Sequence, residues 1–180
     1  ANIRNSDNPE ELLDKGPESG PISINLDLTT ACNYACDHCV DYDILNKGIN
    51  HNYEDLLNSL ESMWKNGLRS VILIGGGEPT IHPKFTETVE FLKERNIQIS
   101  VVSNGSNVPT IGKVGHLFKD KDWVRLSLDS GTDETFQAMH KSRKKITLGQ
   151  ICDDVLELKK NHPNVSIGFS YIVTWKGAYA

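Results

Sequence analysis

Long hydrophobic runs are missing from this sequence of 180 residues. The longest apolar stretch, Val71–Ile74, is far too short to cross a bilayer, which needs about 20 apolar residues. The first ten residues, ANIRNSDNPE, have no apolar core of the kind that a secretory signal peptide carries. We therefore expect no membrane association and a cytoplasmic protein.

An excess of positive charge is also missing. Lys and Arg number 19 against 24 Asp and Glu, for a formal net charge of −5. Nucleic-acid-binding proteins usually present a basic face, so this balance makes nucleic acid an unlikely partner. The one basic run, residues 141–145, is typical of solvated surface. With 38% hydrophobic and 24% charged residues, the chain has the composition of one globular domain.

Cysteine is scarce, and its spacing argues against a disulfide framework. Cys32, Cys36 and Cys39 lie within eight residues of one another, whereas Cys152 stands alone far along the chain. Clustered thiols in a reducing compartment are more typical of metal binding. Cys152 falls in a helical apolar pattern, so we expect it to pack in the core at a helix–sheet interface.

What the chain does contain is an alternation of strand-like and helix-like segments after a polar lead-in at residues 1–21. This alternation indicates an α/β fold with a parallel sheet in a single domain over residues 22–180. Strands are expected at 22–28, 70–75, 97–103, 123–128 and 165–172, and helices at 52–66, 83–95, 107–119 and 147–161.

The expected strands alternate in polarity, although strands covered on both faces normally read as unbroken apolar runs. In residues 123–128, for example, Arg125 and Ser127 fall opposite Val124, Leu126 and Leu128. We therefore expect a curved sheet with helices outside and a polar chamber on its inner face. Four polar side chains that face this chamber are candidates for substrate contact or for a supporting network: Asn25, Asp27, Gln98 and Arg125.

The segment Cys32-Asn33-Tyr34-Ala35-Cys36-Asp37-His38-Cys39 directly follows the first expected strand. Three thiolates at spacings of four and three can converge on one centre. A zinc ion prefers four ligands, and Asp37 and His38 are too close in sequence to complete a tetrahedron easily. A [4Fe–4S] cluster held by three thiolates would keep one iron open. Spacing alone favours the cluster and leaves zinc, or no metal, as alternatives.

Polar and glycine-rich groups follow the next strands at equivalent points. Gly75-Gly76-Gly77-Glu78-Pro79 ends the second strand, and Ser103-Asn104-Gly105 ends the third. Ser127 and Asp129 close the fourth. The carboxyl ends of parallel strands are where such folds bind ligands, and consecutive glycines let the backbone approach a ligand closely.

Together these motifs resemble the radical S-adenosylmethionine (SAM) superfamily. CNYACDHC fits its CxxxCxxC motif and GGGEP fits its GGE motif, in the family's order after the first and second strands. The resemblance covers residues 22–174 and favours a cluster over zinc. It implies a partial (β/α)6 TIM-type half-barrel of parallel strands, with a [4Fe–4S] cluster on Cys32, Cys36 and Cys39. SAM would bind the open iron, and its reductive cleavage would yield a 5′-deoxyadenosyl radical that abstracts hydrogen from a substrate.

The resemblance also implies roles for individual residues. Gly76, Gly77 and Glu78 would contact the SAM amino group, mostly through backbone atoms. His38 holds a place near the adenine that is often aromatic in the family. Ser127 and Asp129 would bind the ribose hydroxyls or the carboxylate, and Asn104 would contact the site. Arg143 would pair with the carboxylate, or else is an exposed residue of the basic run.

The family's half-barrel has six strands, and this chain supplies five, so we expect a truncated core whose fifth strand leaves Phe169 and Tyr171 uncovered. Two hypotheses follow. The chain is a radical SAM enzyme that acts on an unidentified small molecule or peptide and takes electrons from a donor such as flavodoxin or ferredoxin. Alternatively, it is a non-catalytic iron–sulfur or zinc module with the same fold.

Overall fold

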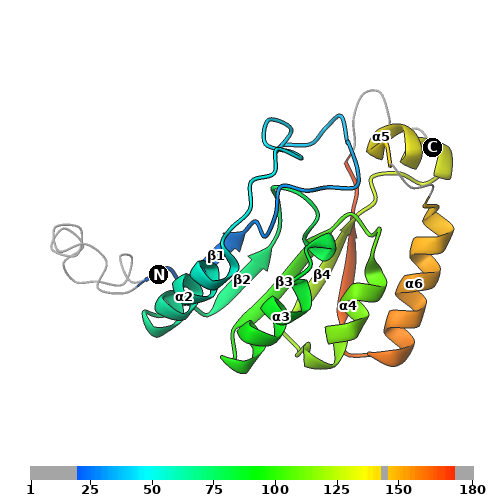
Figure 1. Cartoon of the computed structure of the whole chain (residues 1–180). Helices are drawn as coiled ribbons and strands as arrows, with labels where there is room; N and C mark the ends of the chain where they lie inside the picture. Colours follow the sequence, from blue (N-terminus) through cyan, green and yellow to red (C-terminus); the bar gives the residue numbers. More distant parts are fainter. Residues whose placement is uncertain (1–19, 143–145, 173–180) are drawn as a thin grey trace, which may run out of the picture.

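The fold is built around one parallel sheet. The computed structural model describes residues 20–142 and 146–172, and its five strands lie side by side in chain order (Figure 1). Each strand falls within the range expected from the sequence. The strands are β1 (Ser23–Leu26), β2 (Ser70–Leu73), β3 (Gln98–Ser103), β4 (Trp123–Ser127) and β5 (Ser166–Ser170).

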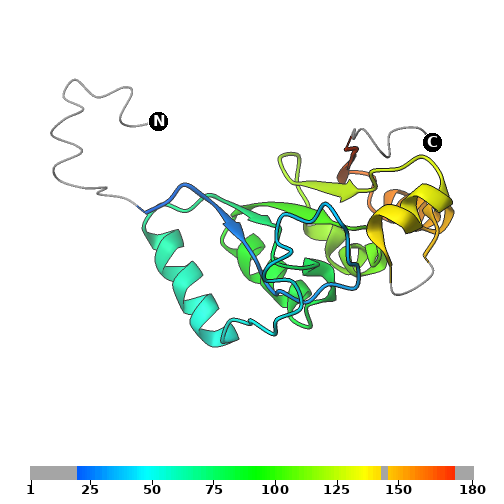
Figure 2. The ribbon, with the colours of Figure 1, turned by 90° about the horizontal axis from the view of Figure 1, so that it is seen from above.

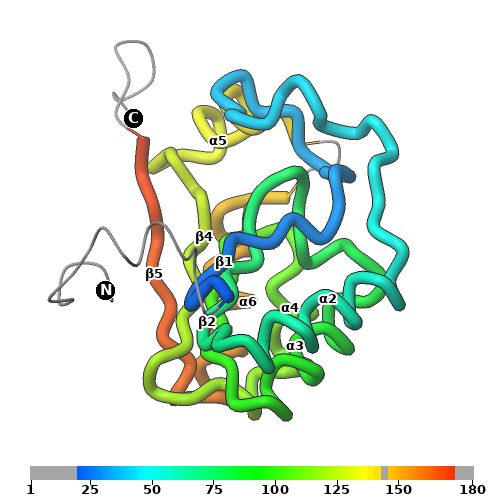
Figure 3. The backbone as a smooth tube through the Cα atoms, turned by 90° about the vertical axis from the view of Figure 1, so that its left-hand side faces the viewer, coloured from blue at the N-terminus to red at the C-terminus, as the bar shows by residue number. Residues whose placement is uncertain are grey.

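The main helices connect successive strands and lie on one face of the sheet, while the other face is open (Figures 1 and 3). Seen from above, α2 lies at one end of this layer and α5 and α6 at the other (Figure 2). The expected α/β half-barrel with helices outside is confirmed for the described residues. The helices are α2 (Tyr53–Lys65), α3 (Phe85–Glu94), α4 (Val108–Val114), α5 (Asp133–His140) and α6 (Leu148–Asn161), with 3₁₀ turns at η2 (Pro79–Ile81) and η3 (Gly115–Leu117).

Local signals explain where α2 begins and ends. The side chain of Asn52 accepts hydrogen bonds from the backbone N–H groups of Glu54 and Asp55, which caps the helix. At the other end Gly67 has a φ of 111°, a conformation that glycine adopts readily. The N–H groups of Gly67 and Leu68 then donate to carbonyls of the last helical turn, at 3.1 and 2.9 Å, as in a Schellman motif.

Alternation along the strands separates core from chamber, as the sequence predicts. Val71, Leu73, Val124 and Leu126 face the helices and are almost fully buried. On the opposite face, Asn25 and Arg125 are exposed. Burying one set of alternating side chains under helices leaves the other set on the open, concave side. Ser100 departs from this pattern because it is buried, and the Gln98 side chain donates to the carbonyl of Lys121 at 2.6 Å, at the amino-terminal end of the sheet.

Helix α5 was not expected. Only Phe136 and His140 of this eight-residue helix are buried, so its apolar stripe is too short to stand out in the sequence. Its start is nevertheless encoded, because the Thr132 hydroxyl accepts from the N–H of Thr135, and Asp133 and Glu134 fill the first turn.

The expectation that Cys152 packs in the core is wrong. The buried face of α6 consists of Ile151, Val155 and Leu158, whereas Cys152 is exposed and Leu156 is 67% exposed. Each helical residue is turned by about 100° from the one before, so Cys152 lies off the narrow stripe that faces the sheet.

Strand β5 forms one edge of the sheet in the described part of the chain. Phe169 and Tyr171 are 57% and 47% exposed, which confirms that residues 20–142 and 146–172 leave them uncovered. None of the helices in these ranges is both long enough and apolar enough to span a bilayer.

At the amino-terminal end of the sheet, a buried ion pair ties α3 to the loop before β4. Lys93 Nζ lies 2.6 Å from Asp122 Oδ2, and both side chains are at least 94% buried. The same carboxylate accepts from the backbone N–H groups of Ile99 and Lys119, both at 2.7 Å. The two buried charges therefore neutralise each other, and both backbone N–H groups have an acceptor.

Replacing Asp122 with Ala should destabilise the domain by about 3–5 kcal/mol, because it leaves the Lys93 ammonium and two N–H groups buried without their acceptor. Urea unfolding monitored by circular dichroism measures the change. Asp120→Ala is the matched control, since Asp120 is exposed and its loss should change the stability by less than about 0.5 kcal/mol. Equal midpoints for the two variants would contradict the assignment.

Candidate functional site

The carboxyl ends of the strands surround one cavity of about 380 Å³. The loop between β1 and α2 and helix α5 lie at this same end of the sheet (Figures 1 and 3). Cys32, Cys36 and Cys39 all line the cavity. Six of the residues that the resemblance assigned to SAM line it as well, namely His38, Gly77, Glu78, Asn104, Ser127 and Asp129, and so does the candidate substrate residue Arg125.

Two of the expected site residues are not placed in the cavity wall. Gly76 is buried and is not part of the lining. Arg143 lies outside the described residues.

Backbone hydrogen bonds hold the cysteine loop in place. The N–H of Cys32 donates to Asn46 Oδ1 at 2.9 Å, and the N–H of Asn46 donates to the carbonyl of Thr30 at 2.7 Å. On the other side, the N–H of Ala35 donates to the carbonyl of His140 at 3.0 Å. The loop is thus attached both to its own later part and to the end of α5.

The cysteine thiols influence one another electrostatically. Burial raises the pKa of the Cys32 thiol and raises that of Cys36 to about 12, with the neighbouring cysteines adding to the second effect. A thiolate at either position is therefore disfavoured unless a cation is present to stabilise it.

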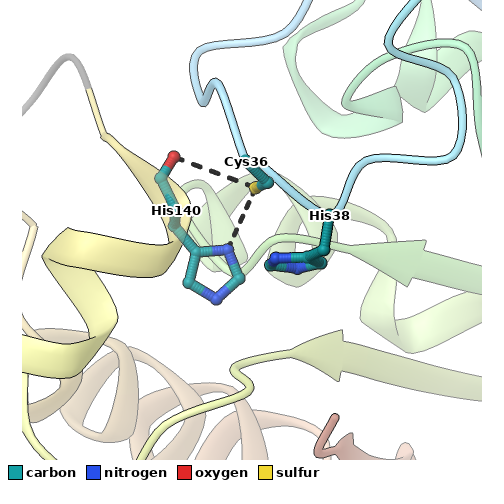
Figure 4. Close-up of side chains that lie close together, drawn as sticks. All are labelled: Cys36, His38 and His140. Carbon is teal, nitrogen blue, oxygen red and sulfur yellow. Dashed lines mark hydrogen bonds between the residues drawn. The ribbon is translucent and has the colours of Figure 1, made fainter. Parts of the chain in front are cut away.

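His140, at the end of α5, contacts the middle cysteine (Figure 4). Its Nδ1 lies 3.2 Å from Cys36 Sγ, and its Nε2 lies 2.9 Å from the carbonyl oxygen of Leu128. Because a carbonyl only accepts, Nε2 carries the proton and Nδ1 faces the sulfur. Burial lowers the pKa of His140, so the neutral ring is favoured.

Asp129 lies close to both histidines of the site. Its Oδ2 is 3.3 Å from His38 Nε2 and 3.8 Å from His140 Nε2, and its Oδ1 accepts from the N–H of Ile172 at 3.0 Å. One donor atom each of Cys36, His38 and His140 lies within 4.8 Å of the others (Figure 4). No pattern in the sequence pointed to His140, because 104 residues separate it from Cys36 and its helix was not expected.

The glycines after β2 allow a close approach to the cysteine loop. A Cβ on Gly77 would lie 2.1 Å from the carbonyl oxygen of Ala31. A Cβ on Gly76, whose φ is 62°, would lie 2.9 Å from the carbonyl oxygen of Thr29. Both positions therefore require glycine to fit the loop that carries the cysteines.

Glu78 connects three segments of the cavity wall. Its carboxylate, 2% exposed, accepts from the N–H and hydroxyl of Thr80, from the Ser103 hydroxyl at 2.8 Å and from the Asn104 N–H at 2.6 Å. Its own N–H donates to the carbonyl of Ala31 at 2.9 Å. Burial raises the pKa of this carboxyl group.

Asn104 and Ser127 place polar groups in the cavity wall. Asn104 Nδ2 donates to Asn33 Oδ1 at 2.8 Å and lies 3.8 Å from Cys32 Sγ. The Ser127 hydroxyl has no hydrogen-bond partner within the described ranges. It is therefore available to a ligand.

Two acidic residues, Asp27 and Asp41, lie close together near the end of β1, and the sequence had pointed only to Asp27. Asp41 Oδ2 accepts from the N–H of Gly76 at 3.1 Å, and the missing side chain of Gly75 makes room for the carboxylates of Asp27 and Asp41. Burial and the nearby Asp41 raise the pKa of Asp27. Asp41 thus binds the glycine turn through Gly76, and no pattern in the sequence singled out Asp41.

Solved structures share this fold. The match to Streptococcus suis SuiB bound to its precursor peptide SuiA has a TM-score of 0.69 at 16% identity, covering 92% of this chain and 36% of that one. A radical SAM methyltransferase from Sphaerobacter thermophilus matches with a TM-score of 0.67 at 15% identity, covering 86% of this chain and 48% of the other. At these identities the likeness establishes the fold.

Curated relatives point to the same family. An S-adenosylmethionine-dependent nucleotide dehydratase of Selenomonas ruminantium is 25% identical over 157 residues, 84% of this chain and 56% of that protein. The mycofactocin maturase MftC of Mycobacterium tuberculosis (strain ATCC 25618 / H37Rv) is 30% identical over 135 residues, 72% of this chain and 32% of that protein. The chain thus spans roughly a third to a half of the length of these relatives.

A family model described as the radical SAM superfamily matches residues 26–176. That range contains the cysteine loop, the glycine turn and the carboxyl ends of all five strands. The chain therefore belongs to the radical SAM superfamily.

Proposed function

We propose that this chain is the core of a radical SAM enzyme whose [4Fe–4S] cluster is held by Cys32, Cys36 and Cys39. The observation that carries the proposal is the convergence of the three thiols on one cavity at the strand ends. The donor set fits the group, because each ligated iron needs one thiolate and three are available. When bound, the cluster supplies the electron that cleaves SAM to methionine and a 5′-deoxyadenosyl radical.

The chain's own residues would hold and orient the two cofactors. Asn104 Nδ2, 3.8 Å from Cys32 Sγ, would donate to that sulfur once it is a thiolate. The Ser127 hydroxyl would bind a ribose hydroxyl or the carboxylate of SAM. Asp129 would orient the His38 ring beside the adenine, since both carboxylate oxygens already have partners. Arg143 remains a candidate for the SAM carboxylate.

Glu78 and the two glycines before it would act mainly on the cysteine loop. The Glu78 carboxylate is fully paired, and its N–H is bound to Ala31, so its side chain would position the loop rather than touch SAM. Gly77 lines the cavity and would offer its backbone to the SAM amino group. Gly76, buried behind it, would support that contact.

A non-catalytic zinc module is a second candidate, supported by one observation. Cys36, His38 and His140 bring donor atoms within 4.8 Å of one another. His140 also donates its other ring N–H to a backbone carbonyl, as metal-bound histidines commonly do. Anaerobic reconstitution with iron and sulfide, followed by dithionite and SAM, separates the candidates. A radical SAM enzyme produces 5′-deoxyadenosine, and a non-catalytic zinc module does not.

The proposed cluster also bears on the cellular compartment and on the electron donor. Free thiols that bind a cluster require a reducing compartment such as the cytoplasm, and the cluster requires a one-electron donor such as flavodoxin or ferredoxin. For the substrate, the relatives and structural neighbours support two classes: nucleotides, from the named dehydratases, and peptides, from SuiB with its precursor peptide.

Replacing Cys32, Cys36 and Cys39 together with Ala should abolish the absorbance of the reconstituted protein near 400 nm (the region where [4Fe–4S] clusters absorb), because no thiolate then remains to hold iron. Iron content measured on the same samples should fall in parallel. Cys152→Ala is the control: this thiol is exposed on α6, away from the cavity, so the absorbance should be unchanged. Equal loss in both variants would contradict the ligand assignment.

Gly77→Ala should lower the iron content of the reconstituted protein severalfold, because the new Cβ collides with the Ala31 carbonyl and displaces the cysteine loop. Gly149→Ala is the matched control, since its Cβ would meet only Thr147 Oγ1 at 3.7 Å, an ordinary contact. Wild-type iron content with weakened SAM binding would instead assign Gly77 to SAM alone.

A further inference from the structure

Arg125 places a positive charge on the open inner face of the sheet. It lies on β4, paired in register with Val102 of β3 and Gly168 of β5, so neither neighbouring strand offers it an acidic partner. Its side chain is exposed, and it lines the strand-end cavity together with the three cysteines.

No hydrogen bond or ion pair involves the Arg125 side chain within residues 20–142 and 146–172. The other two arginines there are engaged: Arg95 lies 2.6 Å from Glu61, and Arg69 donates to the carbonyl of Leu68 at 2.9 Å. The acids of the strand-end cavity, Glu78 and Asp129, are already bound to other groups. Arg125 therefore has its full hydrogen-bonding capacity available.

Space is available where a ligand would meet the guanidinium group. A second cavity, of about 370 Å³, lies against β4 and β5 and is lined by Arg125 together with Trp123, Val124, Ser166, Ile167, Gly168 and Phe169. A Cβ on Gly168 would find nothing within 4 Å, so the wall beside Arg125 is open. Arg125 thus borders both the cavity at the cysteines and the one against β4 and the edge strand β5.

A charge in this position restricts what can fill the chamber. A ligand that covers Arg125 removes water from a guanidinium group, which is unfavourable unless the ligand supplies an acceptor of opposite charge. The planar guanidinium presents paired N–H donors that match a carboxylate or a phosphate.

We propose that Arg125 binds an anionic oxygen group of the substrate, a carboxylate or a phosphate, and so selects anionic substrates. This rests on the proposed function, because it places the substrate beside the cofactors. Arg125 precedes Ser127 by two residues on the same face of β4, about 6–7 Å further from the strand end. In this proposal the offset lets the guanidinium group meet a substrate that lies deeper in the chamber than SAM.

The test is calorimetric titration of the anaerobically reconstituted, SAM-loaded protein with two matched pairs of probes. UTP against uridine tests the phosphate, and trialanine against its C-terminal amide tests the carboxylate. We expect the anionic member of one pair to bind at least tenfold more tightly than the neutral member. Arg125→Gln should remove that difference and Arg125→Lys should keep part of it. Lys121→Gln, which removes an exposed charge outside both cavities, should leave it intact.

Equal binding of both members in both pairs would overturn the proposal, as would an Arg125→Gln protein that keeps the preference. A preference retained alongside a tenfold loss of SAM affinity would reassign Arg125 to SAM. Iron content and SAM affinity of the unmodified protein report on the proposed function separately. The probe titrations are therefore repeated on cluster-free protein, where the same preference is expected, so a failure to load the cluster does not decide the question about Arg125.

Discussion

The arrangement of the strand ends around the cavity depends on the buried carboxylate of Glu78. Its four donors come from the turn after β2 and from the end of β3, and the backbone N–H of the same residue attaches the cysteine loop through Ala31. A buried carboxylate is tolerated only when such bonds replace its hydration. These bonds in turn fix the relative positions of three segments that bear on the cavity.

The glycine turn fixes the same loop by steric contact, as the carboxylate does by hydrogen bonds. Gly76 and Gly77 let the backbone after β2 lie directly against Thr29 and Ala31, where a side chain would force the loop away. The cysteine loop is therefore held by contact on one side and by the carbonyl of His140 on the other. A loop without regular secondary structure acquires a defined shape because its neighbours constrain it from both sides.

Electrostatics then separates the site into two regions. Around the cysteines, burial and mutual repulsion disfavour thiolates, and neutral His140 and the Asp129–His38 pair surround the middle sulfur. Deeper on the open face, Arg125 has no counter-charge within the described residues. In the roles proposed here, the first region would hold the cluster and the second would bind the anionic group of the substrate.

The sequence by itself determined the fold class and the residues that gather at the strand-end cavity. Alternation along the strands separated Val124 and Leu126 from Arg125 and Ser127, and helical spacing located four of the five main helices, because both patterns are local consequences of backbone geometry. The motif spacing located the cysteines, the glycine turn and the polar residues at the strand ends. These signals lie within a few residues of one another along the chain.

Only the tertiary structure decided which partners these residues have. His140 meets Cys36 across 104 residues, Glu78 binds Ser103 and Asn104 rather than standing free, and Cys152 faces solvent although its neighbours Ile151 and Val155 are buried. Such contacts depend on how the sheet brings its strand ends together and on how each helix is rotated against it. Local periodicity predicts neither the arrangement of the strand ends nor the rotation of each helix, since both follow from packing between segments distant in sequence.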